Sequence, residues 1–140
     1  MRILGIDFGE KRIGLALSDP LGFTAQGLET LERQNMKQVT AALVELVKKN
    51  EVGEIVIGLP VNMDGSRGFK ADEILKFVPQ LEAAAGVPVR TWDERLTSRE
   101  ASRLMIEEGL SRKKQRANSD RLAATLILQN YLEFNRRGRE

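Results

Sequence analysis

Acidic residues stand at three places where carboxylates could bind a divalent cation: Asp7, the pair Asp93-Glu94, and Asp120. Each lies beside an apolar segment. A carboxylate in such a place needs a cation or a hydrogen-bonding partner, because burial disfavours its charged form. Hard cations such as Mg²⁺ and Mn²⁺ prefer oxygen ligands. The candidate chemistry is therefore assisted by a divalent metal.

Asp7 lies near the end of the first apolar segment, between Gly5 and Gly9. Glycines leave room for an ion or a phosphate to approach the backbone. A structural alternative is that Asp7 only caps the turn that follows the strand. Its position is compatible with both interpretations.

Asp93 and Glu94 close the last expected strand, residues 87–92. Successive side chains of a strand alternate between the two faces of a sheet, so Glu94 shares its face with Arg90 and Trp92 while Asp93 points the other way. Only one of the two acids can readily share a site with Asp7. The spacing does not choose between them, and the other acid is expected to start a turn or face solvent.

Asp120 precedes a helical pattern of small and apolar residues at three, four, seven and eight positions, namely Ala123, Ala124, Ile127 and Leu128. This pattern places Asp120 at the start of the apolar face, above small residues that let the helix approach a sheet closely. The alternative is an acid in the first helical turn that complements the helix dipole, with Asn118 or Ser119 as the cap.

Three carboxylates from two strands and a helix could converge on a pair of cations. Two ions about 4 Å apart can activate a water and stabilise the leaving oxygen of a phosphodiester. The chain has neither cysteine nor histidine, which excludes a disulfide, a thiolate nucleophile, an imidazole base and a Ser-His triad. The composition therefore agrees with carboxylate and metal chemistry.

Basic residues gather in two short clusters, although the formal net charge is only +2. Residues 112–116 (RKKQR) contain four cations in five positions, and residues 136–139 (RRGR) contain three in four. Such clusters are expected in a protein that binds a phosphate backbone. The alternative is a solvated loop and a frayed tail.

The apolar and turn patterns predict one α/β domain over residues 1–140, with residues 136–140 as a flexible basic tail. We expect a mixed five-stranded sheet with helices on both faces, in which three antiparallel strands precede the parallel ones. The expected strands are 2–8, 13–18, one within 22–31, 54–60 and 87–92. The expected helices are 36–49, 68–85, 97–109 and 119–135, the last after a basic loop.

The chain has no apolar run of the roughly 20 residues that cross a bilayer. The acid at position 7 falls where a signal peptide would have its apolar stretch. We therefore expect a cytoplasmic protein that has no membrane partner.

Four segments together resemble the YqgF/RuvX family, relatives of the RuvC Holliday junction resolvase in the ribonuclease H-like superfamily. They occur in order between residues 5 and 128. They are Gly5-Ile6-Asp7-Phe8-Gly9 with Lys11-Arg12-Ile13-Gly14, Ile57-Gly58-Leu59-Pro60 with Asn62-Met63-Asp64-Gly65, Asp93-Glu94-Arg95-Leu96-Thr97-Ser98, and Asp120 with Ala123-Ala124 and Ile127-Leu128.

The resemblance implies a ribonuclease H-like fold in which Asp7, Glu94 and Asp120 are catalytic and bind Mg²⁺ or Mn²⁺. It favours Glu94 over Asp93. Other positions become candidates for contact with nucleic acid or, alternatively, for roles in turns and caps: Lys11, Arg12, Asn62, Arg95 and Ser98, joined by the cluster Arg112, Lys113, Lys114 and Arg116. A fourth acid near Asp120, as in many resolvases of the superfamily, is absent.

The implied function is that of a metal-dependent nuclease that processes the 5′ end of pre-16S rRNA during ribosome biogenesis. The alternative is a Holliday junction resolvase. The expected partner is structured RNA or branched DNA, bound by a monomer or a homodimer. An ATP-using protein of the actin and sugar-kinase type, suggested by Asp7-Phe8-Gly9, would need a second domain. A binding module without catalysis is disfavoured, because acids repel phosphate unless a cation intervenes.

Overall fold

The computed structural model describes residues 1–62, 64–94 and 112–137, without the side chains of residues 112–121, 136 and 137. It begins with the predicted hairpin, in which β1 (Arg2–Phe8) pairs antiparallel with β2 (Arg12–Ser18). The turn is closed by the Gly9 amide, which donates to the Arg12 carbonyl at 3.1 Å. A Cβ atom at position 9 would collide with that carbonyl oxygen, so the turn directly after Asp7 requires glycine.

The strand predicted within residues 22–31 is present as two short strands. β3 (Ala25–Gly27) and β4 (Leu31–Glu32) both pair antiparallel with β2. The pairing register shifts by one residue between them, because the chain between Gly27 and Leu31 holds one residue more than the facing part of β2. The sheet therefore has six strands rather than the five that we expected.

The remaining strands extend the sheet in parallel. α1 (Met36–Lys49) leads to β5 (Val52–Leu59), which pairs with β1, and α2 (Phe69–Ala85) leads to β6 (Val89–Asp93), which pairs with β5. The strand order is β3-β2-β1-β5-β6, with β4 also beside β2. These elements agree with the predicted ranges to within a few residues. The helix predicted over residues 97–109 lies outside the described residues.

α4 (Arg112–Arg137) is longer than the helix predicted over residues 119–135. Placing the basic cluster of residues 112–116 in a loop was wrong, because α4 begins at Arg112. Arginine, lysine and glutamine are good helix formers, and no glycine or proline interrupts the range, so the helical segment continues through the cluster. Asn118 and Ser119 consequently lie inside α4 rather than at its cap, and Arg136 and Arg137 belong to α4 rather than to the tail.

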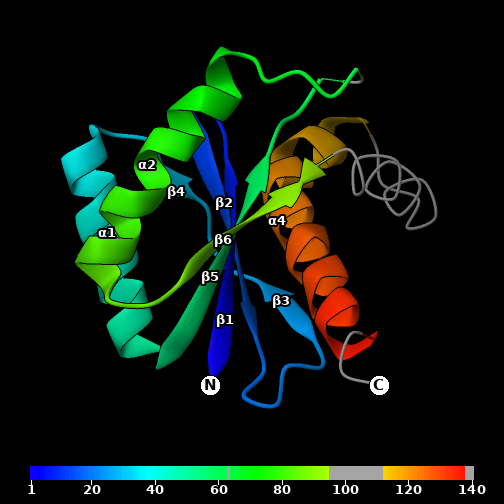
Figure 1. Cartoon of the computed structure of the whole chain (residues 1–140). Helices are drawn as coiled ribbons and strands as arrows, with labels where there is room; N and C mark the ends of the chain where they lie inside the picture. Colours follow the sequence, from blue (N-terminus) through cyan, green and yellow to red (C-terminus); the bar gives the residue numbers. More distant parts are fainter. Residues whose placement is uncertain (63, 95–111, 138–140) are drawn as a thin grey trace.

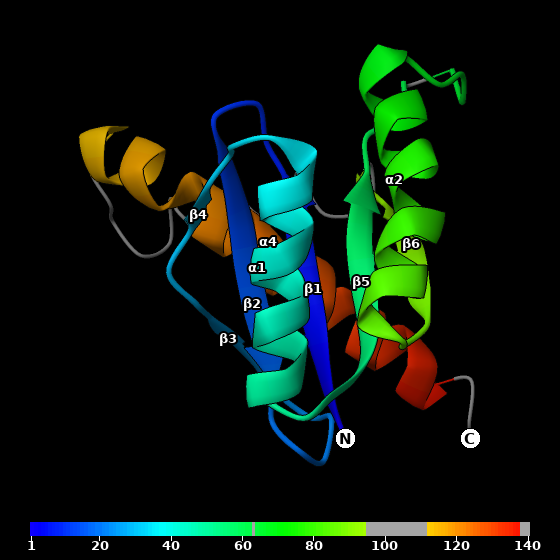
Figure 2. The ribbon, with the colours of Figure 1, turned by 90° about the vertical axis from the view of Figure 1, so that its left-hand side faces the viewer.

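Helices cover both faces of the mixed sheet, as predicted (Figure 1). α1 and α2 lie side by side on one face, and α4 crosses the other (Figure 2). The larger core fills the first face with residues that include Leu4, Ile6, Phe8, Leu43, Ile55, Ile57 and Phe77. The smaller core lies under α4 and consists of Ala16, Val56, Ala124, Ile127, Leu128, Tyr131 and Leu132. Among the described helices, none combines the length and the apolar composition of a membrane-spanning segment.

Candidate active site on the α4 face of the sheet

Asp7 is held on the α4 face by the alternation of side chains along β1. Its neighbours Ile6 and Phe8 are buried in the core beneath α1 and α2, so Asp7 and Gly5 face the other way. The contact of Gly5 identifies that side: a Cβ atom there would lie 2.8 Å from Cβ of Leu128 on α4. Asp7 is half-buried at the carboxyl end of β1.

The strands on either side of Asp7 place glycines beside it. Asp7 is paired with Gly14 of β2. On β5, Ile57 is paired with Ile6, and the next position in this parallel register is Gly58. Both neighbouring strands therefore lack a side chain next to the carboxylate, which leaves room on the α4 face for a ligand or for a side chain from elsewhere.

Glu94 occupies part of this room. A Cβ atom at Gly58 would lie 2.7 Å from Oε1 and 3.0 Å from Cγ of Glu94, so the Glu94 side chain lies directly over β5 at Gly58. Asp93 is paired with Leu59 and, by alternation, faces away from α4. The structure thus brings Glu94, and not Asp93, to the face that carries Asp7. The spacing alone had left this choice open.

Asp120 is placed by the backbone of α4. The carbonyl oxygen of Ala124 lies 3.2 Å from a Cβ atom built at Gly5, whereas Leu132 lies near Gly22 beyond the amino end of β1. α4 therefore runs from the carboxyl end of β1 toward its amino end (Figure 1). The Asp120 backbone, one helical turn before Ala124, lies on the Asp7 side of Gly5.

The alternative role for Asp120 as an acid of the first helical turn is wrong, because α4 begins eight residues earlier at Arg112. The Asp120 side chain lies outside the described part of the structure. Among the side chains that are described, no three acids form a group able to hold a metal ion. Asp7 and Glu94 nonetheless supply the oxygen donors that a hard cation prefers, on one face and beside glycines.

The predicted nucleic-acid contacts surround this region only in part. Lys11 and Arg12 are exposed in and after the turn that follows Asp7. Asn62 is exposed in the loop after β5, where its Nδ2 donates to Oγ of Ser66 at 3.0 Å, so it orders that loop. Two further candidates, Arg95 and Ser98, lie outside the described residues. The backbone of the cluster Arg112, Lys113, Lys114 and Arg116 forms the start of α4, and the side chains of these four residues are not described.

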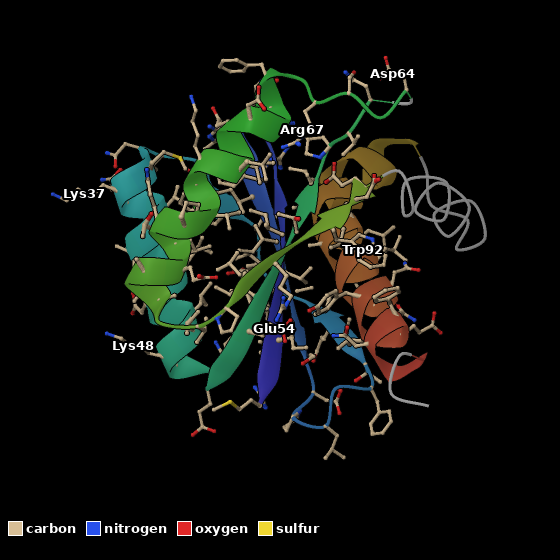
Figure 3. All side chains as sticks on the ribbon, in the orientation of Figure 1. Lys37, Lys48, Glu54, Asp64, Arg67 and Trp92 are labelled. Carbon is tan, nitrogen blue, oxygen red and sulfur yellow. The ribbon has the colours of Figure 1, made fainter. Side chains whose placement is uncertain are left out.

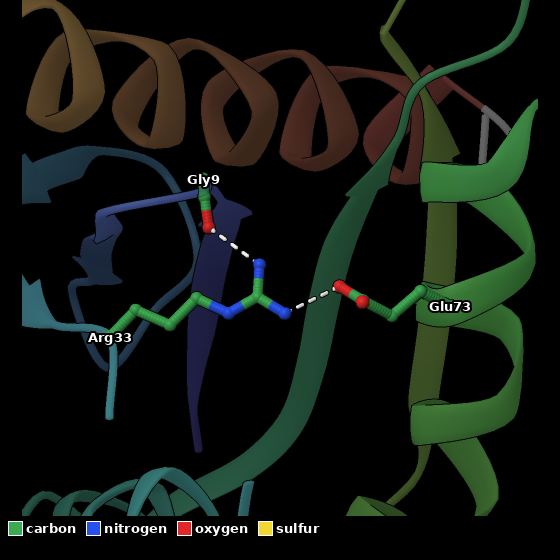
Figure 4. Close-up of polar contacts among 3 residues, drawn as sticks. All are labelled: Gly9, Arg33 and Glu73. Atoms are coloured by element: carbon green, nitrogen blue, oxygen red, sulfur yellow. Dashed lines mark hydrogen bonds and ion pairs between the residues drawn. The ribbon is translucent and has the colours of Figure 1, made fainter. Parts of the chain in front are cut away.

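Arg33 is a residue of this region that the sequence analysis missed. Its Nη1 donates to the carbonyl oxygen of Gly9 at 3.2 Å, and its Nη2 pairs with Oε1 of Glu73 on α2 at 2.6 Å (Figure 4). The guanidinium also lies 4.6 Å above the ring of Phe8. Arg33 thereby ties the turn after Asp7 to α2. No local pattern marks it, because Gly9 and Glu73 are distant in the sequence.

The sequence matches a known protein family over most of its length. Residues 1–134 match the family model described as "RuvX: Holliday junction resolvase". A protein of Clostridium acetobutylicum is 53% identical over 132 residues, which cover 94% of this chain and 98% of that protein. A protein of Moorella thermoacetica is 52% identical and covers 95% of each chain. Both carry the name "Putative pre-16S rRNA nuclease".

Solved structures share the fold at low identity. RuvC of Thermus thermophilus superposes with a TM-score of 0.61 at 20% identity, covering 99% of this chain and 97% of RuvC. The fowlpox virus Holliday junction resolvase gives a TM-score of 0.56 at 13% identity, covering 95% and 99% of the two chains. The fold is therefore that of the RuvC-like ribonuclease H proteins.

Proposed function

The chain belongs to the RuvX family and is a hydrolytic nuclease, and we propose that it depends on a divalent cation and processes the 5′ end of pre-16S rRNA. The observation that carries the proposal is the position of Glu94 over Gly58, on the strand next to Asp7 and on the same face. Two acids, Asp7 near the end of β1 and Glu94 just after β6, are thus directed to one face of the sheet. We further propose that the protein is located in the cytoplasm, because rRNA is processed there.

In this proposal Asp7, Glu94 and Asp120 are the catalytic carboxylates and hold Mg²⁺ or Mn²⁺. A bound divalent cation would supply the positive charge that activates water and stabilises the leaving oxygen of a phosphodiester. The protein contributes the geometry, because glycines beside Asp7 and beneath Glu94 let the carboxylates and the phosphate approach the sheet. Arg33 holds the Gly9 carbonyl and so positions the turn that follows Asp7.

Cations near the site would bind the nucleic-acid backbone. Lys11 and Arg12 are exposed beside the carboxyl end of β1, so a strand whose phosphate lies at Asp7 would pass close to them. We assign the same role to Arg95, Ser98 and the cluster Arg112, Lys113, Lys114 and Arg116. Asn62 orders the loop after β5. The substrate is structured RNA.

A second candidate function is Holliday junction resolution, favoured by the description of the matching family and by the fold of RuvC. The rRNA assignment is preferred because two relatives named for it are 52% and 53% identical to this chain, whereas RuvC and the fowlpox virus resolvase are 20% and 13% identical. A resolvase also presents two sites to a four-way junction. The two substrates therefore make different demands on the oligomeric state.

A cleavage assay with Mg²⁺ or Mn²⁺ tests both candidates when a 16S precursor leader RNA and a four-way DNA junction are supplied side by side. We expect preferential cleavage of the leader. Asp7→Asn should lower cleavage by roughly 100-fold or more, with binding largely retained, because a ligand to the metal contributes several kcal/mol to the transition state. Undiminished cleavage by Asp7→Asn would remove this residue from the mechanism, and exclusive cleavage of the junction would favour the resolvase.

A further inference from the structure

A concave region lies on the same face of the sheet as the candidate active site. A cavity of about 620 Å³ lies between β6 and the last turns of α4, and its lining includes Arg90, Trp92, Tyr131 and Phe134. Its volume lies within the range of cavities that bind small organic ligands. Figure 3 shows Trp92 between β6 and α4 and Glu54 on the neighbouring strand. We call this cavity the aromatic groove.

Three aromatic rings form the apolar part of the aromatic groove. Trp92 meets Tyr131 edge to face, with ring centroids 6.1 Å apart, and meets Phe134 in the same way at 5.8 Å. Phe134 is 64% exposed, so one side of this ring packs against Trp92 while much of its surface faces solvent. An exposed ring that is fixed by its neighbours is suited to stacking against a nucleobase.

Polar groups complete the groove. Arg90 lies at its edge with a side chain that is 65% exposed, and its Nε is 3.5 Å from Oε1 of Glu54. The same Glu54 oxygen accepts a hydrogen bond from the Tyr131 hydroxyl. Burial and this bond raise the pKa of the Tyr131 hydroxyl above its ordinary value. Glu54 thus fixes both Tyr131 and Arg90. The ion pair that Arg90 forms with the described residues uses its Nε atom, and the two terminal nitrogens of the guanidinium can bind a phosphate.

The groove lies on the face of the sheet that carries Asp7 and Glu94. Arg90 and Trp92 alternate along β6 and share the α4 face, about 7 Å apart, and the Glu94 side chain, just beyond the end of β6, lies on the same face over Gly58, the pairing partner of Trp92. A strand of nucleic acid bound at Glu94 would therefore reach Trp92 within a short distance. The Trp92 indole Nε1 is buried and has no hydrogen-bond partner among the described residues.

We propose that the aromatic groove binds an unpaired nucleotide of the substrate strand, with its base stacked on Phe134 beside Trp92 and its phosphate at Arg90. This inference rests on the proposed nuclease function and adds a requirement to it. The strand must be single-stranded on the β6 side of the cleaved bond, because a base that is paired within a duplex cannot stack on Phe134.

The test measures the affinity of a fluorescently labelled single-stranded RNA by anisotropy, with a chelator present to prevent cleavage. Phe134→Ala should weaken binding by roughly 5- to 100-fold, the usual effect of removing one base-stacking ring. Phe134→Trp should bind as the wild type does. The matched control is Phe69→Ala, which removes an 86% exposed ring from the start of α2 and should change nothing.

Two further measurements separate stacking from general attraction. Phe134→Ala should leave the affinity for a fully paired duplex of the same sequence unchanged. Arg90→Gln should reduce the slope of log affinity against log salt concentration by about 0.7, the value for one phosphate contact on a single strand. Unchanged single-strand affinity in Phe134→Ala, or an equal loss in Phe69→Ala or on the duplex, would overturn the proposal. An unchanged salt slope would remove Arg90 from it.

The outcomes also distinguish the groove from the nuclease function on which it rests. Metal-dependent cleavage by the wild type, together with unaltered single-strand binding by Phe134→Ala, would reject the groove and leave the nuclease function intact. Binding that depends on Phe134, without any metal-dependent cleavage by the wild type, would reject the proposed function and retain a single-strand binding site.

Discussion

The two faces of the sheet are made of different kinds of side chain. On β1, Leu4, Ile6 and Phe8 point toward α1 and α2 and are almost completely buried. The alternate positions, Gly5 and Asp7, point toward α4. β1 therefore contributes large apolar side chains to one face, and a glycine and a carboxylate to the other.

β5 repeats the division. Ile55 and Ile57 are fully buried beneath α1 and α2, whereas the α4 face receives Glu54, Val56 and Gly58. Burial of large apolar side chains is the main source of stability, at roughly 25 cal/mol for each Å² removed from water. The α4 face contributes less of this stabilisation, because glycines and carboxylates occupy positions where large apolar side chains could be buried. Substitutions on the two faces should therefore separate stability from activity.

Ile57→Ala on the α1 and α2 face should have the largest effect on stability. Ile57 is fully buried in the larger core, and truncation to alanine should lower the free energy of unfolding by about 2 to 5 kcal/mol. Urea denaturation measures this loss, and Ile57→Val should cost only about 0.5 to 1.5 kcal/mol. Cleavage per folded molecule should be unchanged. A loss of cleavage beyond the loss of folded protein would show that the faces are not separable.

Gly58→Ala, one residue further on the opposite face, should lower cleavage as well as stability. The added Cβ would meet Cδ1 of Ile127 at 2.6 Å and Oε1 of Glu94 at 2.7 Å, so the Glu94 carboxylate must move. We expect a loss of about 1 to 3 kcal/mol in stability, together with a fall in cleavage larger than that of Ile57→Ala. In the control Gly68→Ala, the nearest atom, Nδ2 of Asn62, lies 4.0 Å from the new Cβ, and cleavage should not change. Full activity of Gly58→Ala would contradict the position assigned to Glu94.

Arg33→Gln should have the smallest effect on stability of the three. It removes a partly buried ion pair with Glu73 and the bond to Gly9, which together should contribute about 1 to 2 kcal/mol. Because the turn after Asp7 loses its link to α2, cleavage should fall while the affinity for nucleic acid changes little. Lys48→Gln removes the same charge from an exposed position on α1 and serves as the control. If cleavage changes equally in the two variants, Arg33 acts only through its positive charge and not by holding the turn.

Periodicity predicted most of the fold, because strands and helices that bury one face leave a pattern in the sequence. The hairpin, α1, α2 and the parallel strands β5 and β6 were predicted in this way. The break between β3 and β4 was not, since it depends on a one-residue shift in pairing with β2. The start of α4 was also missed, because a run of basic residues resembles a loop in composition although each residue favours a helix.

For the site, alternation correctly set Asp93 and Glu94 on opposite faces, but it could not say which face carried Asp7. That answer depends on the pairing register of β5 with β1 and of β6 with β5. These registers put Asp93 on the face away from Asp7, and the Glu94 side chain lies over Gly58 on the Asp7 face. The family resemblance had favoured the same residue. Arg33 could not have been found, because its interactions join three segments that are distant in the sequence. The roles of Asp7, Glu94 and Asp120 in metal binding stay predictions.

The central claim is that the carboxylates of the α4 face bind the catalytic cation, and a Mn²⁺ titration followed by electron paramagnetic resonance tests it most directly. Asp7→Asn and Glu94→Gln should each weaken Mn²⁺ binding by about 10-fold or more, whereas Asp93→Asn, on the opposite face, should bind Mn²⁺ as the wild type does. Unaltered affinity in Asp7→Asn and Glu94→Gln, or an equal loss in Asp93→Asn, would contradict the assignment of the metal to this face.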